Sequence, residues 1–423
     1  MQFLTEIPLP VLERTGLDAD LSDAERDVLE TMHRFAAEVM RPVAAKLDRM
    51  TPDEVVADGS PLFDFLKQLD DLGISVLAVA GLEPAVAARL LPLVAEEMGW
   101  GDAGLTILSV AGAFPALAAH LSGNPELIEV FGARRGCWLA TQPDRGSDVA
   151  DMEGFALERG SRHHAGNLVA RVQGDEVVLH GQSSAWVSGA PIAETALAYV
   201  AADYGDGFHR PDGTIHGMAL LVPLDLPGVS RGRPLDKLGQ RPLPQGELFF
   251  EHVRVPARYV LADRDRFHAN FFSVLAFAGL EMSSVFTGVA RAAFEHALAY
   301  THERRQGGVP IIQHQSVRHR LFELWRKTES ARAMARRITS YNLRGSAPHV
   351  LASATGKIHC TQMAFEVASE ALQLFGGNGL TKEYPVEKLL RDARAALIED
   401  GENTILGIVA GSWLSREYQS RAR

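Results

Sequence analysis

The chain has 423 residues, 46% of them hydrophobic and 22% charged, and its 53 acidic side chains outnumber the 42 basic ones to give a formal net charge of −11. This length predicts two or three structural units around a large core, which excludes a small disulfide scaffold. The acidic balance excludes non-specific binding of nucleic acid, which requires a positive field.

The cysteines and the amino terminus both favour a cytoplasmic protein. Cys137 and Cys360 match no CxxC or zinc-ligand spacing, and we expect no disulfide. The first residues lack the basic segment and apolar run of a secretory signal, and no later stretch approaches the roughly 18 to 20 apolar residues that span a bilayer. The adjacent His163 and His164 would point to opposite faces of a strand, so we expect a solvated pair and no metal site.

Residues 1–135 predict an amino-terminal helical domain. Ser22 and Glu25 have the spacing of a capping box, and apolar residues then recur at threes and fours as far as residue 47. Further helical patterns, separated by Gly and Pro, cover 62–72, 84–98 and 104–121.

Residues 136–260 predict a compact β-domain, because short runs rich in Val, Leu and aromatic residues alternate there with turn residues. The predicted strands include 176–179, 195–201, 218–222 and 247–255. Gly174 and Asp175 supply the turn of a hairpin or meander before the first of these strands.

The helical period returns in residues 261–423, where one apolar stripe runs from Val317 to Ile338. Helices, a β-domain and more helices in that order are neither βαβ alternation nor a repeat array. The fold class is therefore predicted to be α+β, mainly helical, with three domains.

Motifs of several enzyme classes are missing, namely GxGxxG, GxxxxGK[ST], HExxH and GxSxG. The remaining local signals each have a purely structural interpretation. Residues 141–148 can form a turn, Trp186 can fill a core, 375–379 can end a helix, and the acidic cluster at 399–402 can cap the last helix.

Taken together and in order, five segments make this sequence similar to acyl-CoA dehydrogenases. They are TQPDRGSD, QSSAWVSG, KLGQRP with LFFEHVRVP, ERRQGG with HQ, and LQLFGGNG with YPVEKLLRDAR. The resemblance covers nearly the whole chain. It implies an amino-terminal helical domain, a middle β-barrel and a carboxy-terminal four-helix bundle, with FAD between barrel and bundle in a homotetramer or dimer.

The resemblance also implies a function, the α,β-dehydrogenation of an acyl thioester such as acyl-CoA. Electrons then pass to an electron-transfer flavoprotein or O2. It places FAD on the barrel side against Trp138, Thr141, Gly146, Ser147, Trp186 and Ser188. The dinucleotide of a neighbouring subunit is expected on Arg304, His314, Gln315, Gln373, Gly376 and Gly377, where an arginine and glycine amides suit a pyrophosphate. Ser147 and Gly401 are expected to approach the substrate as well.

In this family a carboxylate removes the α-proton, and the register after RDAR places Asp400 there, in IEDGEN where members often have YEGT. Aspartate is one methylene shorter than glutamate, so its reach differs. Some members carry the base on the first long carboxy-terminal helix, at the position of Ala278, and Glu281 is one turn further. Glu399 and Glu281 therefore stay open as alternative bases.

Two other functions remain open. A flavin oxidase similar to nitroalkane oxidase also uses an Asp in a DGxN motif, matched by Asp400 to Asn403, but its arginine seven residues later is Gly407 here. A catalytically weak subunit of a hetero-oligomer is the other alternative, since Glu402 and Thr404 replace the Thr and Gln of the family.

Overall fold

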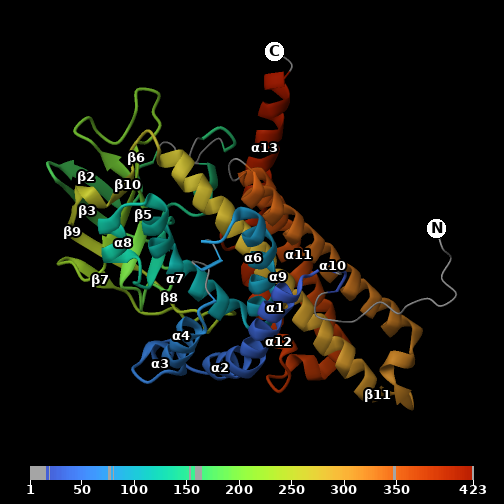
Figure 1. Ribbon diagram of the computed structural model, residues 1–423. Helices are drawn as coiled ribbons and strands as arrows, with labels where there is room; N and C mark the ends of the chain where they lie inside the picture. Colours follow the sequence, from blue (N-terminus) through green and yellow to red (C-terminus); the bar gives the residue numbers. More distant parts are fainter. Residues whose placement is uncertain are drawn as a thin grey trace.

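The computed structural model describes residues 16–18, 20–74, 78–79, 81–151, 154–157, 164–345 and 349–421. Residues 1–15, where a secretory signal would lie, and His163 are outside these residues. Most strands gather on one side of the molecule and the long helices on the other, where β11 lies at the far end, and the helices α1 to α4 lie in the lower part of the view (Figure 1).

The amino-terminal helices follow the predicted pattern with one interruption. Ser22 Oγ accepts a hydrogen bond from the Glu25 amide, and the Glu25 carboxylate accepts one from the Ser22 amide, which confirms the capping box. The helix predicted up to residue 47 is broken by a π-helical stretch, Ala36–Met40. The α-helices are α1 Asp23–Phe35, α2 Arg41–Leu47, α3 Pro52–Val56, α4 Pro61–Leu72, α6 Pro84–Gly101, α7 Ala103–Ser122 and α8 Pro125–Phe131.

A mixed sheet forms the middle of the chain, with the order β10-β6-β5-β2-β3-β9-β7 and with β1 parallel to β5. The strands are β1 Gly136–Leu139, β2 Val169–Gln173, β3 Glu176–Gln182, β4 Val187–Ser188, β5 Thr195–Asp203, β6 Gly217–Pro223, β7 Val229–Arg231, β8 Gln245–Gly246, β9 Leu248–Pro256 and β10 Val260–Ala262. Gln173 pairs with Glu176 across the turn, so the predicted hairpin is confirmed. β4 and β8 pair separately and lead into the site described below.

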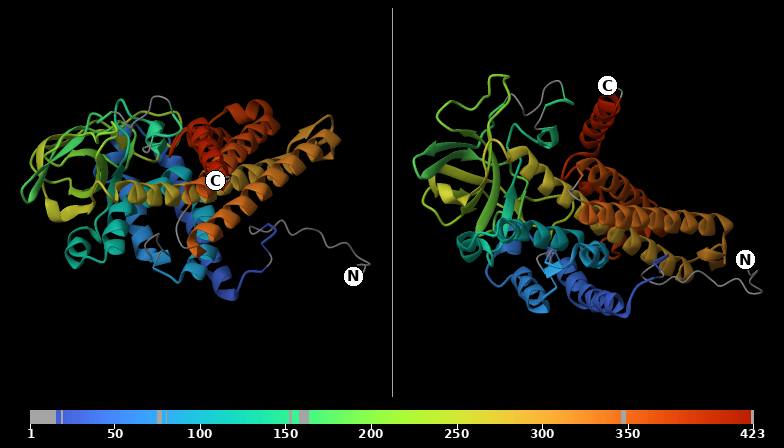
Figure 2. Two further views of the ribbon diagram at one scale, coloured as in Figure 1. Left: turned by 90° about the horizontal axis from the view of Figure 1, so that it is seen from above. Right: turned by 45° about the horizontal axis from the view of Figure 1, so that its top comes forward.

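Three long helices dominate the rest of the chain. These helices, α9 Phe267–Glu303, α10 Gln315–Arg344 and α11 Val350–Phe375, pack against one another, and α12 Val386–Ala396 lies on α9 and α11. A short hairpin, β11 Arg305–Gln306 and β12 Val309–Pro310, joins α9 to α10. The last helix, α13 Asn403–Arg421, projects away from the bundle (Figure 2). The predicted class, mainly helical α+β, is confirmed.

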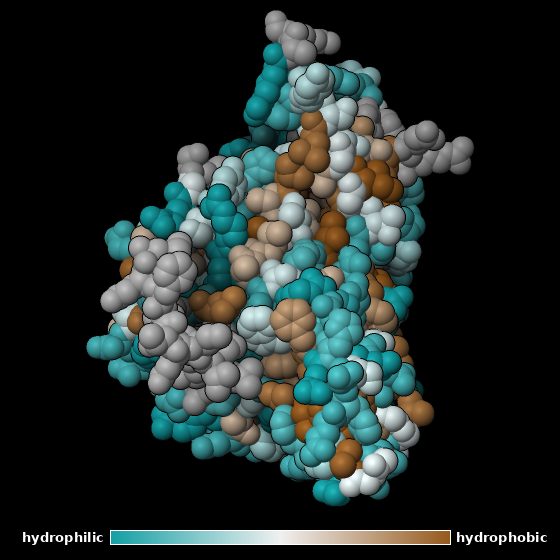
Figure 3. Space-filling model, turned by 90° about the vertical axis from the view of Figure 1, so that its right-hand side faces the viewer, coloured by the Kyte–Doolittle hydropathy of each residue, from teal (hydrophilic) through white to brown (hydrophobic). Residues whose placement is uncertain are grey.

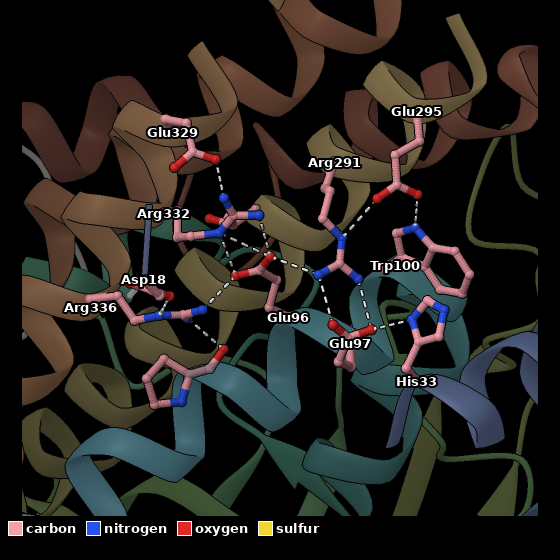
Figure 4. Close-up of polar contacts among 12 residues, drawn as sticks. Asp18, His33, Glu96, Glu97, Trp100, Arg291, Glu295, Glu329, Arg332 and Arg336 are labelled. Atoms are coloured by element: carbon pink, nitrogen blue, oxygen red, sulfur yellow. Dashed lines mark hydrogen bonds and ion pairs between the residues drawn. The ribbon is translucent and has the colours of Figure 1, made fainter. Parts of the chain in front are cut away.

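Helix α6 packs closely on α9, because Gly99 and Gly288 let the two backbones meet. A Cβ at Gly288 would lie 2.1 Å from the carbonyl oxygen of Glu96. Glu96 and Glu97 then pair with arginines of the bundle: Arg291 Nη1 lies 2.7 Å from Glu97 Oε1, and Arg332 Nη2 lies 2.9 Å from Glu96 Oε1 (Figure 4). Burial raises the pKa of Glu96, but the surrounding arginines outweigh burial and lower it to about 2.

Two helices contradict the expectation that no segment reaches membrane-spanning length. α7 and α9 are long and apolar enough, but 67% and 78% of their most apolar windows are buried inside the protein. Their apolar faces pack on the sheet and on neighbouring helices, as those of core helices do. Sequence hydropathy alone does not separate such a core helix from a span.

Candidate active site

A cavity of about 930 Å³, here called the catalytic cavity, has walls from α7, α9, the 141–147 turn, the β4 and β8 ends and the loop after α12. Sequence positions far apart therefore meet in one space. The predicted site residues that line it are Trp138, Thr141, Gly146, Ser147, Trp186, Ser188, Asp400 and Gly401.

Trp186 presents a flat aromatic surface to the catalytic cavity. Its side chain is 63% exposed, so the interpretation as a core residue is wrong. The preceding chain is held by Ser184, whose Oγ lies 2.7 Å from Thr141 Oγ1 and accepts a 3.3 Å hydrogen bond from the Trp186 amide. Gln245 of β8 donates to the Trp186 carbonyl and to Ser188 Oγ, which fixes the chain on the carboxyl side of the indole.

Trp138, on β1, carries a polar group with no partner. Its indole packs edge-on against Phe114, with 5.6 Å between ring centroids, and its Nε1 is buried without a hydrogen bond in the described chain. A buried N–H without an acceptor costs free energy. This donor on the cavity wall, together with the exposed indole of Trp186, fits a flat ligand that carries hydrogen-bond acceptors.

Asp400 lies in the loop between α12 and α13 in a left-handed conformation, with φ of 50°. Aspartate tolerates this conformation better than most residues, which gives a physical reason for Asp rather than Glu at this position. Gly401 follows with φ of 91°, and a Cβ there would lie 2.8 Å from Leu406 Cδ2. The Asp400 carboxylate makes no hydrogen bond to the described part of the chain. Burial raises its pKa, and the charge of Lys357 opposes part of that rise.

Lys357, on α11, binds the loop that carries Asp400. Its ammonium is buried and donates to Gly401 O at 2.6 Å and to Asn403 Oδ1 at 2.8 Å. Burial lowers the pKa of Lys357 to about 8, while the charges of Asp400 and Glu399 oppose the lowering. Lys357 therefore fixes the backbone beside Asp400.

Ser147 holds the same loop from the β-domain side. Its Oγ accepts a 2.9 Å hydrogen bond from the amide of Glu402. The Glu402 carboxylate in turn accepts from the amides of Thr404 and Ile405 at 2.9 and 3.0 Å, and so caps α13. The interpretation of the acidic cluster as a helix cap is right for Glu402 and wrong for Asp400, which is left facing the cavity.

Glu399 also lines the catalytic cavity, but its carboxylate is engaged. Its Oε1 accepts a 2.5 Å hydrogen bond from Gln240 Nε2, in the KLGQRP segment. Gln240 is itself fixed, because its backbone N–H donates to Asp392 Oδ1 on α12. Burial and the charge of Asp400 raise the pKa of Glu399 to about 7.

Glu281 lies on a different wall of the catalytic cavity, that of α9, and is 4% exposed. Gly279, two residues before it, faces α11, where a Cβ would lie 3.1 Å from Ser353 Cβ. Two positions along an α-helix turn the side chain by about 200°, so Glu281 points away from α11 and from the loop that α11 holds. Burial raises the pKa of Glu281 to about 8.

The second predicted cofactor set lies elsewhere, in a cavity of about 540 Å³ at the far end of the bundle, here called the bundle-end cavity. The predicted residues that line it are Arg304, His314, Gln373, Gly376 and Gly377. Gln315 is exposed at the start of α10 and lines neither cavity. Gly376 ends α11 with φ of 59°, as the helix-end interpretation predicts, and a Cβ on Gly376 or Gly377 would meet no atom within 4 Å.

Two domain models of one protein family match this chain. "Acyl-CoA dehydrogenase, middle domain" matches residues 137–253 and "Acyl-CoA dehydrogenase, C-terminal domain" matches residues 273–414, together more than half of the chain. The chain belongs to the acyl-CoA dehydrogenase family. Members are FAD-dependent oxidoreductases that act on CH–CH groups, so the predicted resemblance, enzyme class and cofactor are confirmed at the level of the family.

Curated relatives extend this match along the chain. Benzylmalonyl-CoA dehydrogenase of Aromatoleum aromaticum is 28% identical over 406 residues, which cover 94% of this chain and 100% of that protein. "Probable acyl-CoA dehydrogenase YngJ" of Bacillus subtilis is 32% identical over 273 residues, 64% of this chain and 66% of that protein. Among solved structures, butyryl-CoA dehydrogenase from Megasphaera elsdenii has the same fold, with a TM-score of 0.79 at 24% identity over 94% of this chain and 100% of that chain.

This acyl-CoA dehydrogenase family member also has site residues that sequence reasoning missed, Lys357 and Gln240. Lys357 is the only lysine or arginine of α11, which was the one available signal. In the described ranges no group of three or more His, Cys, Asp or Glu is arranged to hold a metal ion, and His164 Nε2 lies 3.1 Å from Asp144 Oδ2. Cys137 and Cys360 are free and buried, as expected.

Proposed function

We propose that this protein is an FAD-dependent dehydrogenase that introduces an α,β double bond into an acyl thioester, acyl-CoA in the first instance. One observation carries the proposal: the unpaired carboxylate of Asp400 lines the same cavity as the residues predicted to hold the flavin. Lys357 and Ser147 bond to the carbonyl oxygen and the amide of one peptide unit, Gly401–Glu402, so the backbone directly after Asp400 is held in place.

The proposed flavin contacts on the barrel side are those that line the catalytic cavity. The buried Trp138 indole N–H supplies a donor that lacks a partner in the described chain, and Trp186 supplies a stacking surface. Thr141 and Ser188 present hydroxyls already oriented by Ser184 and Gln245. When bound, FAD supplies the acceptor for the hydride that leaves the β carbon of the substrate.

Asp400 is the proposed general base. Its carboxylate takes the α-proton as the α C–H bond breaks, and the electron pair of that bond forms the new double bond as the β-hydride departs. Burial raises the pKa of Asp400 and so makes its carboxylate a stronger base once ionised. The short reach of aspartate is matched by a loop that Gly401 and Lys357 hold rigidly. Glu399 is bonded to Gln240 and Glu281 stands on another wall, so both are weaker candidates.

We further propose that the protein acts in the cytoplasm as a homotetramer or dimer. The bundle-end cavity begins at Tyr300, 15 positions along α9 from Val285 of the catalytic cavity, about 22 Å at the helical rise per residue. Arg304 and the open glycine backbone of the bundle-end cavity suit the dinucleotide of a cofactor seated in a second copy. Apolar side chains lie among polar ones on the face in Figure 3. The large exposed apolar side chains of α10 and α13 are Phe322, Tyr341, Ile408, Leu414 and Tyr418.

An anaerobic titration tests the proposed function. FAD-loaded protein is mixed with a panel of acyl-CoAs, including butyryl-CoA and cyclohexane-1-carbonyl-CoA, and the flavin absorbance is followed. Bleaching by at least one acyl-CoA is expected, and no bleaching by any thioester would contradict the proposal. Rapid oxygen consumption with nitroethane would favour the oxidase alternative, and a purified protein without FAD would favour the weak-subunit alternative.

A further inference from the structure

Glu281 is an acidic residue in an otherwise apolar part of the catalytic cavity. All the other α7 and α9 residues that line this cavity are apolar, among them Val110, Phe114, Leu275 and Met282. Glu281 and Val110 also line a smaller cavity of about 330 Å³, so they form the partition between the two spaces. The carboxyl group therefore stands where an acyl chain entering this part of the cavity would meet it.

Nothing in the described chain satisfies this carboxyl group. Its Oε1 is buried without a hydrogen-bond partner. The hydroxyl groups of the same region are already used, since Thr106 Oγ1 donates to Asp102 O and Ser109 Oγ donates to Thr106 O. Ser284, on α9, likewise donates to the carbonyl oxygen of Leu280. A buried polar group left unpaired costs free energy, so its retention calls for a ligand.

The chemistry of the wall limits what that ligand is. Burial keeps this carboxyl protonated near neutral pH, with a pKa of about 8, so it can both donate and accept a hydrogen bond. No basic residue of α7 or α9 lines the catalytic cavity, so a substrate carboxylate against these walls would find no cation. Arg134 and Arg135 line only the smaller cavity on the other side of the partition. A substrate amine would form a buried ion pair without the further hydrogen bonds that such a pair needs. A neutral oxygen group, such as a hydroxyl or a ketone, needs no cation and forms no buried ion pair, and it can hydrogen-bond to the protonated carboxyl.

We propose that Glu281 is a specificity-determining residue that recognises a hydroxyl or ketone oxygen on the acyl group of the substrate. This inference rests on the proposed function, because it names the class of acyl thioester that the same site takes. A plain hydrocarbon chain would fill the cavity but leave Glu281 unpaired. The oxygen-bearing chain gains a hydrogen bond and removes that cost.

The test compares acyl-CoAs of equal length with and without a hydroxyl group, with the hydroxyl moved along the chain. The wild-type enzyme should prefer one hydroxylated position by about 10- to 100-fold in kcat/KM. Glu281→Leu should reverse this preference, and Glu281→Gln, which keeps a donor and an acceptor, should retain part of it. Met282→Leu, a change on the same wall, should change kcat/KM by the same factor for both substrates of a pair.

Binding supplies a second readout that does not depend on turnover. Calorimetry with FAD-loaded protein and 2,2-dimethylacyl-CoAs, which have no α-hydrogen to remove, should give the same preference and the same loss in Glu281→Leu. An equal kcat/KM within every pair, or a ratio unchanged in Glu281→Leu, would overturn this inference alone. Failure of every acyl-CoA to bleach the flavin would instead overturn the proposed function.

Discussion

The Lys357 ammonium donates a 2.6 Å hydrogen bond to the carbonyl oxygen of Gly401, the residue after the proposed base. A lysine buried in α11 thus fixes the backbone on which Asp400 depends. The same ammonium also bonds to Asn403, so it ties the loop to the start of α13. This arrangement makes Lys357 a positioning residue, because it acts on Asp400 through the loop.

Replacing Lys357 by Met should lower kcat by about a hundredfold, since a misplacement of about 1 Å in a catalytic group costs roughly that much. The measurement is steady-state turnover with the best acyl-CoA, together with the FAD content of the purified variant. Lys327→Met is the matched control, because Lys327 pairs with Glu366 on the outer side of the bundle at 2.6 Å. Equal turnover in Lys357→Met and Lys327→Met would contradict this role.

The pH dependence of kcat/KM should report the effect of the Lys357 charge on the pKa of Asp400. Burial raises the pKa of Asp400 above its usual 3.8, and Lys357 lowers it. Activity requires the ionised base, so kcat/KM should rise with pH through this pKa. Removing the positive charge in Lys357→Met should move the rising limb to higher pH. A limb that stays in place, or moves to lower pH, would show that Lys357 does not act on the base.

Ser147→Ala should slow turnover by about 5- to 50-fold, because the amide of Glu402 loses its acceptor and the loop loses its anchor on the β-domain. Stopped-flow flavin reduction measures the effect. The control is Ser273→Ala, since Ser273 is exposed on α9 and its Oγ donates to the Ala269 carbonyl of its own helix. Wild-type rates of reduction in Ser147→Ala would rule out this contact as a support of the base.

The stability of the protein should depend on pH through Glu281. Its pKa is about 8 in the folded protein against an ordinary 4.5, so between these values the unfolded chain releases a proton that the folded protein keeps. Folding stability from this group is therefore full below about pH 4.5 and declines as pH rises to about 8. Glu281→Gln does not titrate, so its gain in Tm over the wild type should be larger at pH 8 than at pH 5. A gain that is constant with pH would contradict a raised pKa.

The buried network between α6 and the bundle makes a prediction about folding. Arg291→Met leaves Glu97 and Glu96 without one of their guanidinium partners inside the core, and should destabilise the protein by about 3–5 kcal/mol. Urea unfolding measures the loss. Arg326→Met, which breaks an exposed pair with Glu323, should have little effect. Equal midpoints for the two variants would exclude a stabilising role for the network.

The fold was predictable where the pattern is local. The apolar spacing of α4 follows the 3.6-residue period, whereas α6 and α7 are buried on nearly all sides. Ser22 with Glu25 marks the start of α1, because a capping box involves only neighbours in sequence. The π-helical stretch Ala36–Met40 was missed, since no local composition rule separates it from a continuous helix.

The site was predictable only in part, for the same reason. Asp400 and Ser147 lie in recognisable motifs, but they are joined through the amide of Glu402, 255 positions from Ser147. Lys357 supports the base from the first third of α11, where the sequence gives only one lysine in an apolar helix. The deep burial of Glu281 depends on α7 and α9 together, which no single segment specifies.

The most direct test of Asp400 as the base is the rate of flavin reduction in Asp400→Asn, measured by rapid anaerobic mixing of the FAD-loaded variant with the acyl-CoA that best bleaches the wild type. General-base catalysis contributes about 10²- to 10⁴-fold, so the variant should lose that much rate while its FAD content and acyl-CoA affinity are retained. A rate of reduction equal to that of the wild type would contradict the assignment of Asp400 as the base.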